Sequence, residues 1–173
     1  MRKITMLIVL LSLTACQGQV NKKAVRNETT NTENQELIDS KYKVAKTDAQ
    51  WREELTAEQY YVLRNKGTER PHTGEYDKFF EEGVYVCAAC NHPLFKSDAK
   101  FDSHCGWPSF DQAIEGSVIH EHDSSHGMNR TEVLCSSCGG HLGHVFDDGP
   151  KETTGNRFCT NSVSIKFIPA KKK

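Results

Sequence analysis

Two Cys-x-x-Cys pairs constrain the fold of this chain more than any other feature of its sequence. Cys87 and Cys90 form the first pair, and Cys135 and Cys138 form the second, with 44 residues between the pairs. Each pair follows a strand-like run and precedes turn residues, which is typical of a knuckle that presents two thiolates on one side. Two knuckles supply four sulfur ligands for a closed, tetrahedral zinc site. We therefore expect one structural Zn²⁺ per chain, which joins distant segments of one domain.

Two other interpretations of these pairs stay open. A thioredoxin-like redox motif would need a helix that starts at the first cysteine, and Pro93 and Gly139-Gly140 oppose such a helix. Paired disulfides are the second alternative, since exported proteins form them readily.

The N-terminus indicates export. Arg2-Lys3 precedes a largely apolar run of ten residues, Ile4 to Leu13, which is too short to span a bilayer of about 30 Å as a helix. Leu13-Thr14-Ala15-Cys16 resembles a bacterial lipobox, which implies cleavage before Cys16 and lipid attachment to its sulfur. A short buried helix is the alternative. We expect a signal peptide over residues 1–15 and a lipid anchor that holds the protein on a bacterial membrane, facing the periplasm or the cell exterior.

The remaining chain divides into a tether and one domain. Residues 16–45 are rich in Asn, Gln, Thr, Glu and Lys, and their apolar residues are too scattered to offset the entropy of ordering. Residues 46–170 suffice for one domain with one core. Loss of the signal peptide changes the formal net charge from −1 to −3. Because the chain shows no basic patch of the kind that binds nucleic acid, we expect no nucleic-acid partner. We also expect a monomer.

The folded part is expected to begin with two short helices and to continue as antiparallel β structure. Thr47-x-x-Gln50 and Thr56-x-x-Gln59 resemble capping boxes, so we predict helices over residues 48–55 and 57–65, the second ending at Gly67. Short β-like runs with turn residues between them follow, which favours two antiparallel sheets in a mainly β fold. These runs are Val84 to Val86, Ser117 to Ile119, Glu132 to Leu134 and Val163 to Ile168.

Cys105 and Cys159 are the two cysteines that neither the lipobox nor the knuckles use. Two such thiols beside a zinc site suggest a nucleophile and a second thiol that resolves its oxidised form. A structural Cys105–Cys159 disulfide is the alternative.

The sequence around Cys159 predicts a polar surface. If residues 157–167 form one strand, Arg157, Cys159 and Asn161 share a face. The guanidinium would then favour the thiolate of Cys159 and lower its pKa, and Asn161 could donate a hydrogen bond to a polar substrate. The alternative is that Cys159 is a small buried residue of a core strand, without a catalytic role.

Two further segments carry candidate functional groups. His141 and His144 stand three residues apart beside glycine turns and acids, a plausible cluster for proton donation, with zinc ligation as the alternative. Trp107, held between Gly106 and Pro108, could line a rigid apolar pocket or belong to the core.

Taken together, these motifs resemble the B-type methionine sulfoxide reductases over about residues 46 to 169. That family has two antiparallel sheets around the active site, peripheral helices and often a four-cysteine zinc site away from the chemistry. The matching segments are Gly67-Thr68-Glu69, Cys87-x-x-Cys90, Cys105 to Phe110, Cys135-x-x-Cys138, His141 to Phe146 and Arg157 to Asn161.

The resemblance implies a reaction and a role for each site residue. Cys159 would attack methionine-R-sulfoxide in oxidised proteins and become a sulfenic acid. Cys105 would then form a disulfide with Cys159, and a thioredoxin-like dithiol would reduce that disulfide. His144 would serve in catalysis, and Trp107 would hold the substrate methyl group. The other substrate-binding residues implied are His141, Asp148, Arg157 and Asn161.

Two departures from the family pattern are visible, and two other function classes stay open. His104 stands where the family commonly has glycine, and the segment 151–155 is one residue longer than usual. A zinc-ribbon binding module without catalysis would leave Cys105 and Cys159 far apart or inert. A thiol-disulfide oxidoreductase would turn over disulfides but not methionine sulfoxide.

Overall fold

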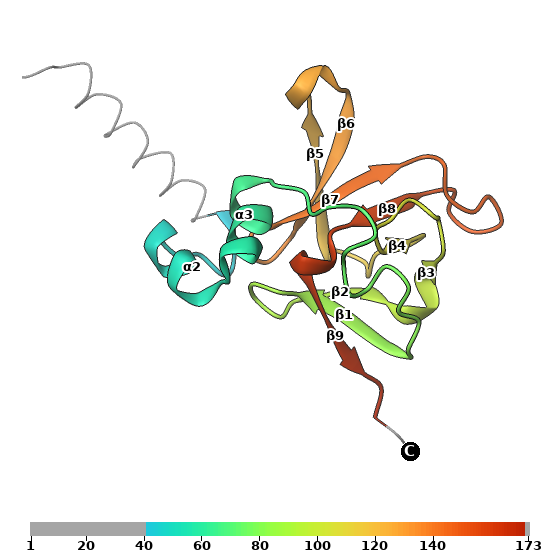
Figure 1. Cartoon of the computed structure of the whole chain (residues 1–173), viewed down its shortest axis with the longest axis horizontal. Coiled ribbons are helices and arrows are strands. Elements are labelled where there is room, and N and C mark those ends of the chain that lie inside the picture. Colours follow the sequence, from blue (N-terminus) through green and yellow to red (C-terminus); the bar gives the residue numbers. More distant parts are fainter. Residues whose placement is uncertain (1–40, 172–173) are drawn as a thin grey trace, which may run out of the picture. The chain divides into compact units, whose positions relative to one another are not determined.

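The computed structural model describes residues 41–171, shown in colour in Figure 1. The predicted signal peptide, the lipidation site Cys16 and residues 16–40 of the predicted tether lie outside the described residues. Folded contacts begin before residue 46, because the Val44 amide donates to the Ser137 carbonyl at 2.9 Å. No helix among the described residues has the length and apolar character needed to cross a membrane.

Two short helices open the fold as predicted. Helix α2 spans Asp48–Glu54 and helix α3 spans Ala57–Asn65, and both begin with a complete capping box, at Thr47 and Thr56. In each box the threonine hydroxyl and a glutamine amide satisfy backbone groups that the first turn leaves unpaired. Lys66 caps the C-terminus of helix α3 and adopts a left-handed conformation with φ 56°. The buried residues of these helices are Trp51, Tyr60, Val62 and Leu63.

Two antiparallel sheets make up the rest of the described chain, which confirms the predicted mainly β fold. The smaller sheet has the strand order β2-β1-β9 and the larger has the order β3-β4-β8-β7-β6-β5. In Figure 1 the helices lie beside the larger sheet, where α3 contacts β7. The strands are β1 Gly83–Cys87, β2 Pro93–Lys96, β3 Lys100–Phe101, β4 Ser109–Phe110, β5 Val118–Asp123, β6 Arg130–Cys135, β7 His141–Phe146, β8 Arg157–Thr160 and β9 Ile165–Pro169. Three 3₁₀ turns, η1 Ser97–Ala99, η2 Ser125–Gly127 and η3 Ser162–Ser164, connect some of them.

Aromatic side chains from both sheets meet in the core. Phe95 of β2 stacks on Phe110 of β4 with ring centroids 4.3 Å apart and an interplanar angle of 10°. Tyr85 of β1 meets the same Phe110 ring edge-on at 5.0 Å. Aromatic contacts of this kind stabilise beyond the area that they bury. The core therefore fixes β4, and with it the neighbouring strand β8, against the smaller sheet.

The prediction of one continuous strand over residues 157–167 was wrong. Strand β8 ends at Thr160, the turn η3 follows, and β9 pairs in the other sheet. A distant carboxylate explains the break: Glu69 accepts hydrogen bonds from the backbone amides of Ser162 at 2.6 Å and Val163 at 3.0 Å. These contacts satisfy backbone amides that a continuous strand would have paired with a neighbouring strand.

Candidate active site

Strand register places Cys159 in a row of polar side chains across the larger sheet. In the β4–β8 ladder Cys159 lies opposite Ser109, and in the β7–β8 ladder it lies opposite His144. His144 in turn lies opposite Glu132 of β6. Residues directly opposite in antiparallel strands point to the same face, with Cβ atoms about 5 Å apart. The sheet therefore sets a thiol beside an imidazole without any loop between them.

The structure brings the two remaining thiols together. The sulfur atoms of Cys105 and Cys159 lie 3.6 Å apart, and both thiols are free and partly buried. A disulfide needs about 2.05 Å, so the loop that carries Cys105 must move by only about 1.5 Å to form one. Such closeness fits a redox-active pair and also the structural disulfide, whereas the zinc-ribbon alternative expected the two thiols to lie far apart or to be inert.

The two thiols share a proton unequally. The pKa of Cys105 is lowered to about 4, first by its hydrogen bond with the Cys159 thiol and then by its contacts with the Ser103 and Ser109 hydroxyls, against the opposing effect of burial. The pKa of Cys159 is raised by that same contact with Cys105 and then by burial, while the positive charge of Arg157 lowers it. Arg157 thus lowers the pKa of Cys159, as predicted, but the contact with Cys105 and burial raise that pKa by more. The contact with Cys105 and burial therefore oppose the thiolate form of Cys159, and Arg157 favours it.

Arg157 is itself held by Asp148. Its Nε and Nη2 atoms donate to the two carboxylate oxygens of Asp148, each at 2.8 Å, and its guanidinium covers the Phe146 ring at 4.6 Å. A two-pronged pair of this kind fixes the plane of a guanidinium. Arg157 and Cys159, two residues apart on β8, share one face as predicted.

Each histidine of the predicted cluster is oriented by a carboxylate that sequence reasoning missed. His141 Nδ1 lies 2.7 Å from Glu132 Oε1, and both side chains are at most 3% exposed. His144 Nε2 lies 2.8 Å from Asp123 Oδ2. The two rings lie 5.4 Å apart. A carboxylate on one ring nitrogen fixes the tautomer and leaves the other nitrogen for chemistry.

Burial lowers the pKa of His144, and the Asp123 carboxylate partly offsets that effect. Within residues 41–171, the Nε2 atom of His141 is buried and has no hydrogen-bond partner. Because buried polar atoms are seldom left unpaired, this nitrogen is an unmet hydrogen-bonding group beside the His144 ring.

Trp107 and Asn161 both depend on the Glu69 segment. Trp107 Nε1 donates to the Glu69 carbonyl at 3.2 Å, which holds the half-buried indole in place. Asn161 is only 3% exposed; its Oδ1 accepts from the Glu69 amide at 3.1 Å and its Nδ2 donates to the Leu142 carbonyl at 3.0 Å. Its predicted role as a substrate ligand stays a prediction, and the structure shows it joining β7, β8 and the Glu69 loop.

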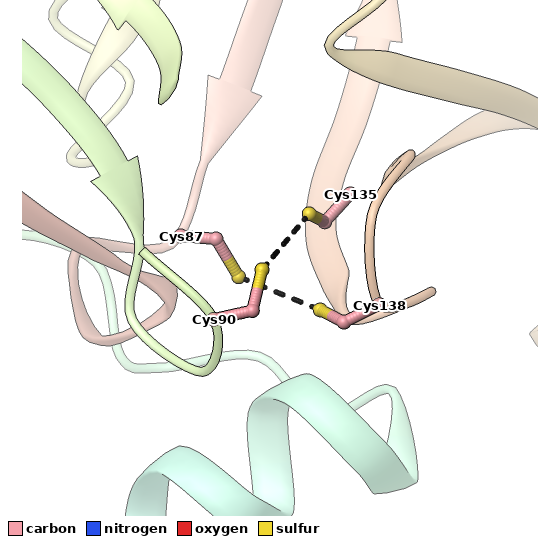
Figure 2. Close-up of side chains that lie close together, drawn as sticks. All are labelled: Cys87, Cys90, Cys135 and Cys138. Carbon is pink, nitrogen blue, oxygen red and sulfur yellow. Dashed lines mark hydrogen bonds between the residues drawn. The ribbon is translucent and has the colours of Figure 1, made fainter. Parts of the chain in front are cut away.

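The four knuckle cysteines form one cluster, shown in Figure 2. Their sulfur atoms all lie within 4.8 Å of one another, with Cys87 to Cys138 at 3.7 Å and Cys90 to Cys135 at 3.6 Å. A tetrahedral ion with metal–sulfur bonds of about 2.3 Å would place its ligands about 3.8 Å apart. The donor set and its spacing therefore fit a metal ion.

The two knuckles also share one backbone pattern. The Asn91 amide donates to the Cys87 carbonyl at 2.9 Å, and the Gly139 amide donates to the Cys135 carbonyl at 2.8 Å. Asn91 and Gly139 both adopt left-handed conformations, with φ 59° and 69°. Cys87 ends β1 and Cys135 ends β6, so an ion held here would join the two sheets.

Comparison with known proteins decides the family. Residues 55–169 match the SelR domain model. Over 128 residues, or 73% of this chain, the sequence is 56% identical to "Peptide methionine sulfoxide reductase MsrB" of Chromohalobacter salexigens, of which 96% is covered. The proteins of the same name from Agrobacterium fabrum and Bradyrhizobium diazoefficiens are 58% and 60% identical over the same length, with 94% and 91% of each covered. The chain belongs to the B-type methionine sulfoxide reductases.

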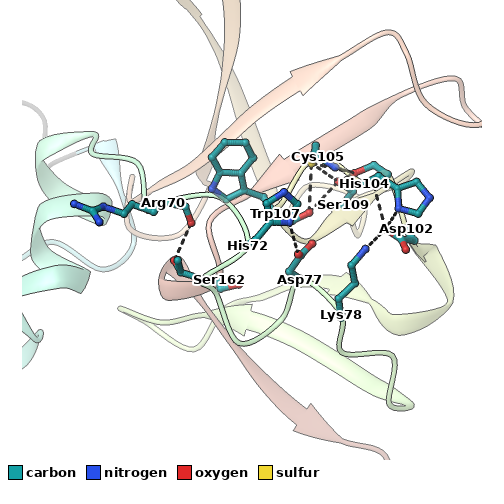
Figure 3. Close-up of polar contacts among 12 residues, drawn as sticks. Arg70, His72, Asp77, Lys78, Asp102, His104, Cys105, Trp107, Ser109 and Ser162 are labelled. Carbon is teal, nitrogen blue, oxygen red and sulfur yellow. Dashed lines mark hydrogen bonds and ion pairs between the residues drawn. The ribbon is translucent and has the colours of Figure 1, made fainter.

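Within this B-type reductase, the two departures from the family pattern lie in exposed loops. His104 adopts a left-handed conformation with φ 56°, and its Nδ1 lies 3.2 Å from Asp102, which also pairs with Lys78 at 2.6 Å (Figure 3). Segment 151–155 forms turns, closed by a Gly149 amide to Gly155 carbonyl bond of 2.9 Å. Neither loop removes a candidate catalytic group.

Proposed function

We propose that this protein reduces methionine-R-sulfoxide, chiefly in oxidised proteins, to methionine. The observation that carries the proposal is the pair of free sulfur atoms 3.6 Å apart, with His144 opposite Cys159 in the sheet. A nucleophile, a resolving thiol and a proton donor are the groups that this reduction needs. Membership in the reductase family and the names of the relatives support the same reaction.

The first half-reaction follows from these groups. Cys159 attacks the sulfoxide sulfur as a thiolate, while an acid from the His141–His144 cluster protonates the departing oxygen. The oxygen leaves as water, and a bond joins the Cys159 sulfur to the substrate sulfur. Water then adds to the Cys159 sulfur, that S–S bond breaks, and methionine leaves with the bonding pair. The substrate sulfur has gained two electrons, and Cys159 has lost two and become a sulfenic acid. Cys105 then forms a disulfide with Cys159, and water leaves. An external thioredoxin-like dithiol reduces that disulfide.

Substrate recognition is assigned to the residues around the two thiols. Trp107, held by the Glu69 carbonyl, would contact the substrate methyl group. The residues that would surround the sulfoxide are His141, His144, Asp148, Arg157 and Asn161. A chiral sulfur needs three distinguished substituents, and an apolar slot beside an oxygen-binding cluster could select the R epimer.

We also propose that the four-cysteine cluster holds Zn²⁺ with a structural role. Four thiolates form a closed site with no position for substrate, and zinc prefers such a set. The Arg64 side chain donates to the Cys138 carbonyl at 3.0 Å, so an ordered knuckle also supports helix α3. Cys138 is followed closely by His141, which means that the knuckle helps to fix the start of β7.

The proposed organisation of the whole chain follows the sequence. Residues 1–15 would be the signal peptide, residues 16–45 a tether lipidated at Cys16, and residues 46–170 the reductase domain. The enzyme would then act as a monomer on the extracytoplasmic side of a bacterial membrane. The lipobox-like ending at Cys16 is the observation that supports this placement.

Separated sulfoxide epimers test the proposed activity. With a dithiol reductant, the full-length protein should convert the R epimer and leave the S epimer untouched, and Cys159→Ser should convert neither. Turnover of small disulfides without turnover of either sulfoxide would favour the thiol-disulfide oxidoreductase instead.

A further inference from the structure

We propose that Ser103 and Ser109 form a hydroxyl relay that activates Cys105 for its attack on oxidised Cys159. This inference rests on the proposed function and deepens its second half-reaction. It makes the two serines positioning residues, which act through Cys105 rather than on the substrate.

The contacts around the Cys105 sulfur define the relay. Ser103 Oγ donates to Cys105 Sγ at 3.0 Å, and the oxygen atoms of Ser103 and Ser109 lie 2.7 Å apart. Ser109 Oγ lies 3.5 Å from the same sulfur. A serine hydroxyl has one proton to donate. The single Ser109 proton has two acceptors within reach, Ser103 Oγ at 2.7 Å and the Trp107 carbonyl at 3.3 Å. With the Ser103 proton on sulfur, donation from Ser109 to the nearer Ser103 oxygen polarises the chain toward Cys105.

The relay is held by the strand beside the nucleophile. Ser109 is 1% exposed and lies opposite Cys159 in the β4–β8 ladder. Its hydroxyl also lies 3.3 Å from the Trp107 carbonyl, and Figure 3 shows Ser109, Trp107 and Cys105 gathered at one place. Ser109 therefore keeps its position relative to Cys159 while the loop that carries Ser103 and Cys105 closes on it.

The relay matters most after Cys159 has been oxidised. In the resting site the largest contribution to the lowered pKa of Cys105 is the hydrogen bond from the Cys159 thiol. Oxidation replaces that S–H group, and the Ser103 hydroxyl, 3.0 Å from the Cys105 sulfur and polarised by Ser109, is the side-chain donor that remains. The positive charges of Arg157 and Lys78 also act on Cys105 from β8 and from the neighbouring loop.

The step itself balances. The Cys105 thiolate attacks the sulfur of the Cys159 sulfenic acid, an S–S bond forms and the S–O bond breaks. The Cys105 sulfur is oxidised and the Cys159 sulfur is reduced. The hydroxide that departs and the proton that Cys105 lost leave together as water. Because the thiolate is the attacking species, donors to its sulfur increase the reactive fraction near neutral pH.

Separate measurement of the two half-reactions of the full-length protein tests the relay. One equivalent of R sulfoxide is mixed with reduced protein without a reductant, and both methionine and the Cys105–Cys159 disulfide are followed in time, with a sulfenic-acid trap as a third readout. In Ser103→Ala, methionine formation should not be slowed, whereas disulfide formation near pH 7 should slow roughly tenfold, the effect of one hydrogen bond to a charged group. Ser103→Thr, which keeps the hydroxyl, should restore the rate.

A matched control is Ser97→Ala. Ser97 is also partly buried and also makes a 3.0 Å hydrogen bond, from the Gly83 amide to its hydroxyl, but that bond lies in the smaller sheet. This variant should form the disulfide at the wild-type rate. The deficit of Ser103→Ala should shrink as the pH rises through the pKa of Cys105, because at high pH the thiolate forms without the hydroxyl.

A second readout does not need sulfoxide activity. In Cys159→Ser, alkylation of Cys105 followed against pH by peptide mass spectrometry reports the pKa of that thiol, and adding Ser103→Ala should raise it. An unmoved pKa, an unchanged rate of disulfide formation, or equal slowing in Ser97→Ala would overturn the relay. Failure of the wild-type protein to form methionine would instead overturn the proposed function, while the alkylation result would still stand.

Discussion

A methyl group added at Gly143 should displace the strand that carries Cys159. Gly143 lies on β7 opposite Thr160 of β8. A Cβ atom at this position would lie 2.0 Å from the Cys159 carbonyl oxygen and 3.1 Å from Thr160 Cα. Ordinary close contacts between carbon and carbonyl oxygen are about 3.3 Å, so the two strands would have to separate by roughly 1 Å. Both obstructing atoms are backbone, which no rotamer change can move.

The loss of unfolding free energy caused by this clash can be separated from the ordinary loss when a glycine is replaced by alanine. Overpacking against backbone costs about 3 kcal/mol, so Gly143→Ala should lower the melting temperature by roughly 6–12 °C. Gly116 is the control: it has φ 71° and nothing within 4 Å of its added Cβ. Gly116→Ala should cost only about 1 kcal/mol, from the left-handed backbone, or roughly 2–4 °C.

Thermal unfolding and single-turnover kinetics of the two variants measure this difference. A shift of about 1 Å at the nucleophile should slow methionine formation on the order of a hundredfold in Gly143→Ala and leave Gly116→Ala at the wild-type rate. Equal melting temperatures and equal rates in the two variants would refute the claim that close packing of β7 on β8 positions Cys159.

Three other changes have defined expected results. Cys138→Ser should lower metal content and melting temperature together, because metal-binding free energy is folding free energy in such sites. The control Cys159→Ser should lower neither. A wild-type protein that is equally stable in chelator would contradict the structural role of the metal. The contacts of Glu132 with His141 and Lys66 lower its pKa against the opposing effect of burial. The stability that a carboxylate with a depressed pKa contributes is present above its unfolded pKa of about 4.3 and is lost as the pH falls through the folded value. Denaturant unfolding between pH 7 and pH 3 should therefore show a shallower loss in Glu132→Gln, and an unchanged slope would contradict this. Cys16→Ala should abolish labelling of the protein by a lipid precursor, whereas an unlabelled wild type would contradict the anchor.

Local signals made much of the fold predictable from the sequence. Both capping boxes, at Thr47 and Thr56, lie within four residues of the groups that they satisfy, so the helix starts could be predicted. The knuckles at Cys87 and Cys135 are equally local, because each is a turn of a few residues. Their meeting as one cluster followed only from the chemistry of four thiolates, and the structure confirms it.

Long-range contacts explain what the sequence could not predict. The break between β8 and β9 depends on the Glu69 carboxylate, which lies 93 residues from Ser162. Asp123 of β5 orients His144, and Glu132 of β6 orients His141. The one signal for these contacts in the sequence was Glu132, an acid at the start of a predicted strand. A carboxylate beside the apolar half of a strand needs a partner when it is buried, and that partner here is His141.

A single turnover of Cys105→Ser with separated epimers tests the central claim most directly. This variant keeps the proposed nucleophile and lacks only the thiol that resolves it. Without a reductant, it should form about one equivalent of methionine from the R epimer and none from the S epimer, and a sulfenic acid should persist on Cys159. Absence of methionine from Cys105→Ser, or an equal yield from both epimers, would contradict the account.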